Sequence, residues 1–196
     1  MELSLDLNKR YTYADYLTWL DDKRRELING FIHLMSPAPR LKHVKVSTNI
    51  VWCLKTIVKK NKGKCEIYPA PFDVRLPKNG EANNDKIYTV VQPDISVVCN
   101  LSKLDELGCC GAPDMIVEVL SPSTAKKDMT KKFDLYEEHG VKEYWIVHPN
   151  DKTINVFLLQ QDGKYDEGTF YEFEGNVPVY VFDNYPIDLN DIFDTK

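Results

Sequence analysis

The sequence has no run approaching the roughly 18 consecutive apolar residues of a membrane-spanning helix, so we expect no membrane partner. Its N-terminus lacks a basic segment followed by an apolar one, which argues against a secretory signal. The cysteines number five, an odd count, and no pair is spaced as Cys-x-x-Cys. This pattern suggests neither a disulfide framework nor a zinc site, and it favours a reducing cytoplasm.

Several motifs of common enzyme classes are also missing. There is no Gly-x-Gly-x-x-Gly and no Gly-x-x-x-x-Gly-Lys-Ser/Thr, so a nucleotide-binding loop is not supported. The histidines form no His-Glu-x-x-His, which disfavours a zinc protease. Because no Gly-x-Ser-x-Gly is present, we interpret Ser121 and Ser123 as helix-capping residues rather than nucleophiles.

What remains is an ordinary globular composition. Hydrophobic residues make up 43% and charged residues 28% of the 196 residues. A chain of this length buries roughly 70% of its unfolded surface and does not need disulfides for stability. We predict one domain over residues 1–196, with a core over about 13–159 and an acidic extension over about 160–196.

The charges are segregated along the chain, although the net charge is −5. Residues 36–65 contain no acidic residue, whereas residues 161–196 carry nine carboxylates against two lysines. A helix predicted over 43–60 places Lys45, Lys55 and Lys59 on its outer face. Such a face can bind the phosphates of DNA, and the alternative is a plain solvated surface.

Hydrophobic patterns predict the fold class. Asn29-Gly30 between two short apolar runs indicates an N-terminal hairpin. Apolar runs over 89–99, 115–120 and 143–147 are typical of buried strands, and a helix predicted over 125–139 joins the last two as a parallel pair. We therefore expect an α/β or α+β fold with a central mixed sheet flanked by helices and short strands toward the C-terminus.

Two carboxylates interrupt these apolar strands. Asp94 stands in the middle of the run 89–99, and Glu118 lies within Met-Ile-Val-Glu-Val-Leu. A carboxylate in a buried strand is costly unless it is paired, hydrogen-bonded or bound to a metal. A single case is explained equally well by a structural ion pair or a solvent-facing strand end, but two in one small domain favour a functional site.

The helix after Glu118 supplies a lysine. Its periodicity turns Phe133 and Tyr136 toward the core, with Met129, and makes Lys132 lean over the sheet edge while Lys131 points away. Asp128, one turn before Lys132, is placed to hold it. Two carboxylates can bind a hard cation such as Mg²⁺, and a lysine can orient a water or stabilise a developing anion. The trio of Asp94, Glu118 and Lys132 suits metal-assisted hydrolysis of a phosphodiester.

Gln92-Pro93-Asp94, followed by Glu118 in a buried strand, resembles the PD-(D/E)XK nuclease superfamily. Two longer blocks are more specific, Gly-Ala-Pro-Asp-Met-Ile-Val-Glu-Val-Leu-Ser-Pro-Ser-Thr at 111–124 and Gly-Val-Lys-Glu-Tyr-Trp-Ile-Val at 140–147. Both resemble the Uma2 family of bacterial restriction endonuclease-like proteins, over about residues 13–159.

The resemblance implies a restriction endonuclease-like fold and an endonuclease that acts on DNA with Mg²⁺, for which Mn²⁺ can substitute. It implies Asp94 and Glu118 as metal ligands. The superfamily's usual lysine lies two residues after the second acid, where this chain has Leu120. The family takes its lysine from the following helix instead, and Lys132 occupies that place.

Glu26 and His43 also match family positions near the site. A nuclease that cuts both strands often works as a two-fold dimer, which leaves a homodimer open. Two other functions remain open at this stage. One is a catalytically silent module on the same fold that binds nucleic acid or protein. The weaker one is a glycosidase, which would need its carboxylates ~5 to 9.5 Å apart across a sugar groove.

Overall fold

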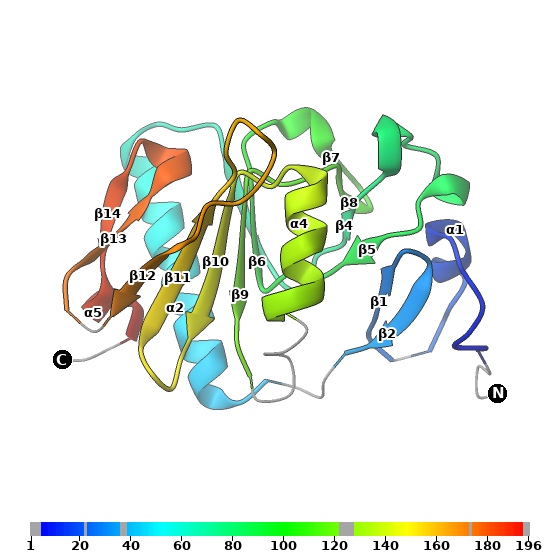
Figure 1. The fold of residues 1–196 in the computed structure, drawn as a ribbon, viewed down its shortest axis with the longest axis horizontal. Helices are drawn as coiled ribbons and strands as arrows, with labels where there is room; N and C mark the ends of the chain where they lie inside the picture. Colours follow the sequence, from blue (N-terminus) through cyan, green and yellow to red (C-terminus); the bar gives the residue numbers. More distant parts are fainter. Residues whose placement is uncertain (1–4, 22, 36–38, 122–127, 173, 194–196) are drawn as a thin grey trace.

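The computed structural model describes residues 5–21, 23–35, 39–121, 128–172 and 174–193, apart from the side chains of Asn79, Asp128 and Met129. Two six-stranded sheets and a C-terminal hairpin make up the strand framework (Figure 1). The central sheet has the order β12-β11-β10-β9-β6-β3 and the N-terminal sheet the order β2-β1-β5-β4-β8-β7. In the described part, no helix is both long and apolar enough to cross a membrane.

The central sheet contains β3 (Glu66–Pro69), β6 (Ile95–Val98), β9 (Met115–Val119), β10 (Glu143–His148), β11 (Thr153–Leu158) and β12 (Thr169–Glu172). The N-terminal sheet contains β1 (Arg25–Ile28), β2 (Phe31–Leu34), β4 (Val74–Arg75), β5 (Val90–Val91), β7 (Leu104–Asp105) and β8 (Gly108–Cys110). The C-terminal hairpin is β13 (Asn176–Val179) with β14 (Tyr185–Asp188). The helices are α1 (Tyr13–Tyr16), α2 (Leu41–Lys60), the π-helical turn η4 (Asp128–Lys132), α4 (Phe133–His139) and α5 (Leu189–Phe193). Short 3₁₀ turns are η1 (Lys78–Gly80), η2 (Asn84–Lys86), η3 (Leu101–Lys103) and η5 (Tyr180–Phe182).

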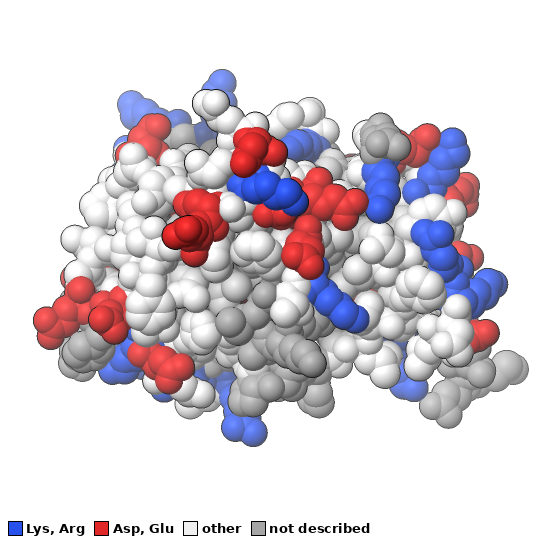
Figure 2. Space-filling view, viewed as in Figure 1, with Lys and Arg blue, Asp and Glu red and all other residues white. Residues whose placement is uncertain are grey.

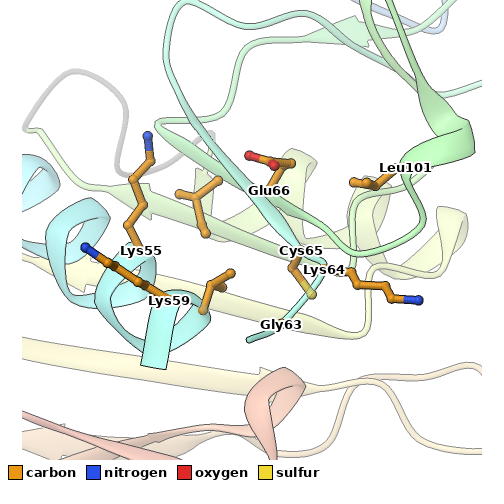
Figure 3. A pocket seen from close by; sticks show the side chains of 9 residues that line it. Lys55, Lys59, Gly63, Lys64, Cys65, Glu66 and Leu101 are labelled. Atoms are coloured by element: carbon orange, nitrogen blue, oxygen red, sulfur yellow. The ribbon is translucent and has the colours of Figure 1, made fainter. Parts of the chain in front are cut away.

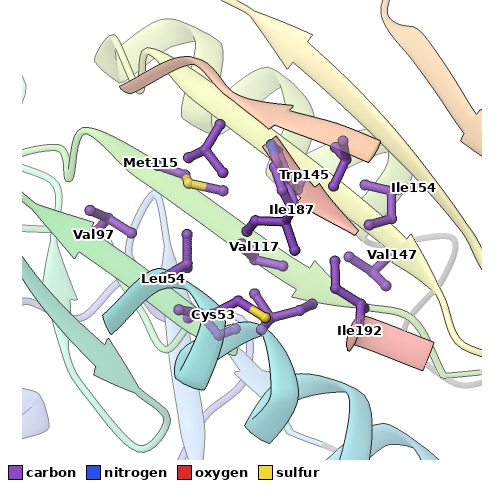
Figure 4. Close-up of a cluster of buried hydrophobic side chains, with 14 of the residues drawn as sticks. Cys53, Leu54, Val97, Met115, Val117, Trp145, Val147, Ile154, Ile187 and Ile192 are labelled. Carbon is purple, nitrogen blue, oxygen red and sulfur yellow. The ribbon is translucent and has the colours of Figure 1, made fainter. Parts of the chain in front are cut away.

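Helices cover both faces of the central sheet. On one face α2 packs its apolar side, including Ile50 and Leu54, against strand residues such as Val117 and Trp145 (Figure 4). The C-terminal hairpin and α5 complete this core with Ile187 and other side chains. On the other face α4 lies over the sheet, between its strands and the N-terminal sheet (Figure 1). A core of this kind stabilises by burying apolar surface, about 25 cal/mol per Å².

The second core lies under α4 and joins the two sheets. Ile28 of β1, Ile116 of β9 and Tyr136 of α4 belong to the same buried cluster. Glu26 and Glu118 each stand two residues from one of these strand positions. Because side chains alternate along a strand, both glutamates face this same layer. β1 and β9, which belong to different sheets, therefore each place one carboxylate on the side of the molecule that α4 covers.

Most predicted elements are confirmed. β1 and β2 form the N-terminal hairpin, and its turn holds Asn29 at φ 53° and Gly30 at φ 87°, the left-handed conformation that Asn-Gly favours. β9 and β10 pair in parallel. The helix predicted over 43–60 is α2. The helix predicted over 125–139 appears as η4 and α4, and residues 122–127, with the capping residue Ser123, lie outside the described part.

The apolar run 89–99 is not one strand. β5 belongs to the N-terminal sheet and β6 to the central sheet, and the segment Gln92–Asp94 crosses between them. Pro93 cannot donate a ladder hydrogen bond, which explains why strand pairing stops there. The prediction that Asp94 interrupts a buried strand is therefore wrong, because Asp94 lies just before β6 and its side chain is partly exposed.

The expectation that no disulfide forms is also wrong for one pair. Cys65 and Cys99 are joined by a disulfide across 34 residues of sequence. The antiparallel pairing of β3 with β6 sets Glu66 opposite Val98, so the residues flanking that pair, Cys65 and Cys99, meet at the sheet end. The spacing of the cysteines in the sequence does not predict this disulfide, because the disulfide depends on the pairing of β3 with β6.

Candidate active site

Glu118, near the carboxyl end of β9, is 3% exposed and is held by two side chains of the following helix. Lys132 Nζ lies 2.7 Å from Glu118 Oε1, and the Tyr136 hydroxyl donates to the same oxygen at 2.7 Å. Lys132 and Tyr136 are one helical turn apart, so both can reach one carboxylate. A buried carboxylate needs partners of this kind to offset its lost hydration.

Glu26 brings a second buried carboxylate from the other sheet. Its Oε1 lies 3.1 Å from Lys132 Nζ and accepts a hydrogen bond from the backbone N–H of Gln92 at 3.0 Å. The side chain of Lys132 is 5% exposed and that of Glu26 1% exposed. One lysine therefore bridges carboxylates from the two sheets, and the cluster Glu26–Glu118–Lys132 carries an excess of one negative charge when all three are ionised.

Tyr136 reports on the electrostatics of this cluster. Burial, followed by the nearby charge of Glu118, raises the pKa of Tyr136 well above its usual value. The phenol is therefore a permanent donor to Glu118 at neutral pH. A hydrogen bond from a neutral donor to a carboxylate is stronger than a bond between neutral groups, which helps to fix the position of Glu118.

Asp94 lies beside this cluster and has two partners of its own. Its Oδ2 accepts a hydrogen bond from the backbone N–H of Val119 at 2.8 Å, and its Oδ1 lies 3.2 Å from His43 Nε2. His43 is in the first turn of α2, as the inward-facing position in the sequence predicts. β6 and β9 pair with Ile95 opposite Val117, so the next pair of positions is Asp94 and Glu118.

Asp94 and the Glu118–Lys132 pair therefore lie at the same end of the central sheet, where β9 ends and β6 begins. The amino end of α2 and the start of the η4–α4 helix lie at this same end (Figure 1). Among the residues that the structure describes, no group of three or more His, Cys, Asp or Glu side chains is arranged to hold a metal ion. Asp94 and Glu118 carry carboxylate oxygens, the donor type that a hard cation such as Mg²⁺ prefers.

The two adjacent lysines of η4 separate as predicted. Lys132 is buried, whereas Lys131 is exposed. The predicted partner of Lys132, Asp128, has its side chain outside the described part, as does Met129 of the predicted inner face. Within the described part, Glu26 and Glu118 contact Lys132 from the strands.

The basic residues predicted to contact DNA are not part of this cluster. Lys45, Lys55 and Lys59 are exposed on α2. Lys55 is twelve residues beyond His43, which corresponds to about 18 Å along the helix axis. On the molecular face that carries α4, acidic and basic side chains lie intermixed (Figure 2).

Two participants were not predicted as site residues. Tyr136 was interpreted as a core aromatic, and its position four residues after Lys132 is the signal that could have found it. Gln92 links the site to a neighbouring polar network: its Nε2 donates to Asp73 at 2.8 Å, and Arg24 donates to its Oε1. No motif in the sequence predicts this network, because it depends on the crossing between the two sheets.

Comparison with known proteins places this geometry in a family. A family profile described as "Putative restriction endonuclease", Uma2, matches residues 13–185. The chain belongs to the Uma2 family. That match confirms the resemblance drawn from the sequence blocks at 111–124 and 140–147, and it covers the site residues from Glu26 to Lys132.

Two individual proteins show how far the similarity extends. The uncharacterized protein slr1290 of Synechocystis sp. is 28% identical over 153 residues, which are 76% of this chain and 74% of that protein. A crystal structure described as a "putative nuclease belonging to DUF820" from Anabaena variabilis has a TM-score of 0.72 with this chain. It covers 94% of this chain and 98% of its own, at 23% identity. This likeness confirms the expected fold class.

Proposed function

We propose that the chain is a metal-dependent endonuclease that hydrolyses phosphodiester bonds in DNA. Membership of the Uma2 family supports a nuclease. The single observation that carries the proposal is the contact of Lys132 with Glu118 at 2.7 Å, beside Asp94 at the same end of the sheet. Two acids can hold a divalent cation and a lysine can stabilise developing negative charge, so these residue types suit phosphodiester hydrolysis.

The donor set of the site fits Mg²⁺, with Mn²⁺ as a substitute. Glu118 on β9 and Asp94, just before the neighbouring strand β6, offer hard carboxylate oxygens. Mg²⁺ keeps several waters and is usually bound through one or two carboxylates plus substrate phosphates, so two protein ligands are sufficient. A bound cation of this type would supply Lewis-acid polarisation of the phosphate and of the attacking water.

The protein side chains have distinct roles in this proposal. Lys132 places a positive charge where negative charge develops on the phosphate, and it keeps Glu118 fixed. His43 and the N–H of Val119 hold the two oxygens of Asp94 in one orientation. Glu26 keeps Lys132 in place from the N-terminal sheet, and Tyr136 does the same for Glu118. Glu26 and Tyr136 are positioning residues.

The proposal extends to the partners. DNA is the substrate, with Lys45, Lys55 and Lys59 contacting its phosphates. Because cleavage of both strands needs two sites of opposite orientation, a homodimer with two-fold symmetry is the expected assembly for double-strand cutting.

A plasmid-nicking assay tests the proposal. Purified protein is incubated with supercoiled plasmid and Mg²⁺ or Mn²⁺, and the open-circular form is quantified. We expect cleavage that EDTA abolishes. Asp94→Asn and Glu118→Gln should each lower the rate at least a hundredfold, because each loses one charged ligand. Asp85→Asn, an exposed carboxylate on η2, is the matched control and should retain activity.

The lysine pair gives a second comparison in the same assay. Lys132→Ala should lower the rate about a hundredfold, whereas Lys131→Ala should cost little beyond weaker DNA binding. Lys132→Arg keeps a cation between the glutamates and controls for folding. If the wild type does not cleave with either cation, the chain is a silent binding module. Equal losses from the Lys131 and Lys132 variants would contradict the assignment of Lys132.

A further inference from the structure

The outer side of α2 carries one continuous exposed row of side chains. Its members are spaced by three, four or seven residues, as neighbours on one helix face are. They are Lys45, Thr48, Trp52, Lys55 and Lys59, and all are exposed. From Lys45 to Lys59 the row extends about 21 Å along the helix. We call this row the α2 outer row.

Trp52, in the centre of the row, is unusually accessible for a tryptophan. It is 63% exposed, whereas Trp145 is fully buried in the core. Trp19 packs its ring against Tyr11 and Tyr16. A tryptophan offers a broad flat ring and one N–H donor, and for this reason tryptophan is enriched where proteins bind other molecules. α5 does not cover it: Asn49 on α2 donates to the carbonyl of Ile192, while the side chain of Trp52 stays open to solvent.

The charged side chains that α2 itself places around Trp52 are all basic. No acidic residue occurs in the sequence from 36 to 65, so α2 itself contributes only cations. Beyond its last turn, α2 borders a hollow of about 400 Å³, which Lys55, Lys59 and Lys64 line together with Glu66 at the start of β3. Figure 3 shows Lys55 extending upward from the helix and Lys59 extending to the left. From α5, Asp191 raises the pKa of the buried Cys53 thiol, after the larger effect of burial.

We propose that the α2 outer row binds single-stranded DNA, with an unpaired base stacked on Trp52 and the flanking phosphates on Lys55 and Lys59. An exposed indole between lysines offers the two features that sequence-independent single-strand binding uses, a stacking platform and a cationic track. A duplex keeps its base faces stacked inside the helix, so it could use the lysines but not the indole. The inference rests on the proposed function and deepens it: the nuclease engages an unpaired segment of its substrate.

The test measures binding without catalysis. A labelled single-stranded oligonucleotide of about 15 nucleotides and a hairpin duplex are titrated in EDTA, and affinities are read from fluorescence anisotropy. Trp52→Ala should weaken single-strand binding at least fivefold, the lower end of a stacking contribution, and change duplex binding less than about twofold. Trp52→Phe should retain most of the single-strand affinity, because a phenyl ring still stacks.

The lysines are tested through the salt dependence of the same affinity. Lys55→Gln combined with Lys59→Gln should reduce the slope of log affinity against log salt by about 1.4 for single strands. Lys78→Gln with Lys86→Gln removes the same charge from exposed sites elsewhere and should leave the slope unchanged. Equal weakening of single-strand and duplex binding by Trp52→Ala, or no weakening of either, would overturn the proposal.

The outcome is separable from the nuclease proposal. If the wild type fails to cleave but Trp52→Ala selectively loses single-strand binding, the inference stands and the nuclease proposal falls. If cleavage depends on Asp94 and Glu118 but Trp52→Ala has no selective effect, the nuclease proposal stands and the proposal that Trp52 stacks on an unpaired base is overturned.

Discussion

Glu118 and Glu143 are both buried glutamates on neighbouring parallel strands, yet their surroundings differ. Glu118 is near the end of β9, on the α4 face, and it contacts an ammonium and a phenol. Glu143 begins β10 and is fully buried. Its Oε1 accepts from the Trp145 indole N–H at 2.7 Å, and its Oε2 accepts from the N–H of Val181 at 2.8 Å.

Glu143 has no cationic partner among the residues that the structure describes, and its buried carboxyl has a raised pKa. Burial raises its pKa to about 7, because hydrogen bonds from Val181 and Trp145 offset only part of the lost hydration. Glu143 ties η5 to the central sheet and has a structural role. Burial of a carboxylate in a strand therefore does not identify a site. The cation beside Glu118, and the second acid across the strand pair, are what distinguish it.

Removing the cation should give the largest effect on stability. Lys132→Met would leave Glu26 and Glu118 buried without their shared positive partner, so we expect a loss of about 3–5 kcal/mol in the free energy of unfolding. The loss should shrink at low pH, where protonation neutralises the carboxylates. Urea unfolding followed by far-ultraviolet circular dichroism measures it.

Lys131→Met is the matched control, because Lys131 is the adjacent residue and is exposed. It should change the free energy of unfolding by less than about 0.5 kcal/mol. Replacing both partners, in Lys132→Met with Glu118→Gln, should recover part of the stability. If Lys132→Met and Lys131→Met lowered the free energy of unfolding by similar amounts, the contact of Lys132 with the glutamates would contribute nothing to stability. Glu118 would then resemble Glu143, a buried glutamate that no cation of the described residues stabilises.

The pH dependence of the free energy of unfolding tests the assignment of Glu143 as a buried acid without a cationic partner in the described part of the chain. Between pH 4.5 and about 7 the unfolded chain releases the Glu143 proton while the folded protein keeps it, so the free energy of unfolding falls as the pH rises. The full contribution is about 3 kcal/mol. Glu143→Gln mimics the protonated side chain and should remove this slope from the difference between variant and wild type.

Glu138→Gln, on the exposed side of α4, serves as the control for that measurement and should keep the wild-type slope over the same range. The assignment of Glu143 as a buried acid would be wrong if Glu143→Gln and the wild type lost stability in parallel from pH 5 to pH 8.

The sequence predicted the parts of the site that local patterns encode. The run Met115–Val119 with one glutamate predicted both β9 and its carboxylate, and helical periodicity placed Lys132 inward and Lys131 outward. The Asn29-Gly30 turn predicted the hairpin that carries Glu26. In each case the information lies within a few residues, because side-chain direction follows from the period of the element.

Long-range pairing was beyond the same reasoning. The run 89–99 has the composition of one strand, but its halves belong to two sheets, which moves Asp94 to a crossing point. The meeting of Cys65 with Cys99 and of Glu26 with Lys132 also depends on how distant strands pair. No local period in the sequence specifies which strands become neighbours.

The smallest expected effect compares two buried tyrosine hydroxyls. Tyr136 donates to Glu118 Oε1 at 2.7 Å, and Tyr165 donates to the carbonyl of Val141 at 3.0 Å. A hydrogen bond to a charged group contributes about 2 kcal/mol and one between neutral groups about 1 kcal/mol. Tyr136→Phe should therefore lower the free energy of unfolding about twice as much as Tyr165→Phe in urea titrations at pH 8. The two substitutions remove the same atom from buried rings, so their difference isolates the acceptor. If Tyr136→Phe costs no more than Tyr165→Phe, Glu118 does not carry a negative charge in the folded protein, and its contact with Lys132 is not an ion pair.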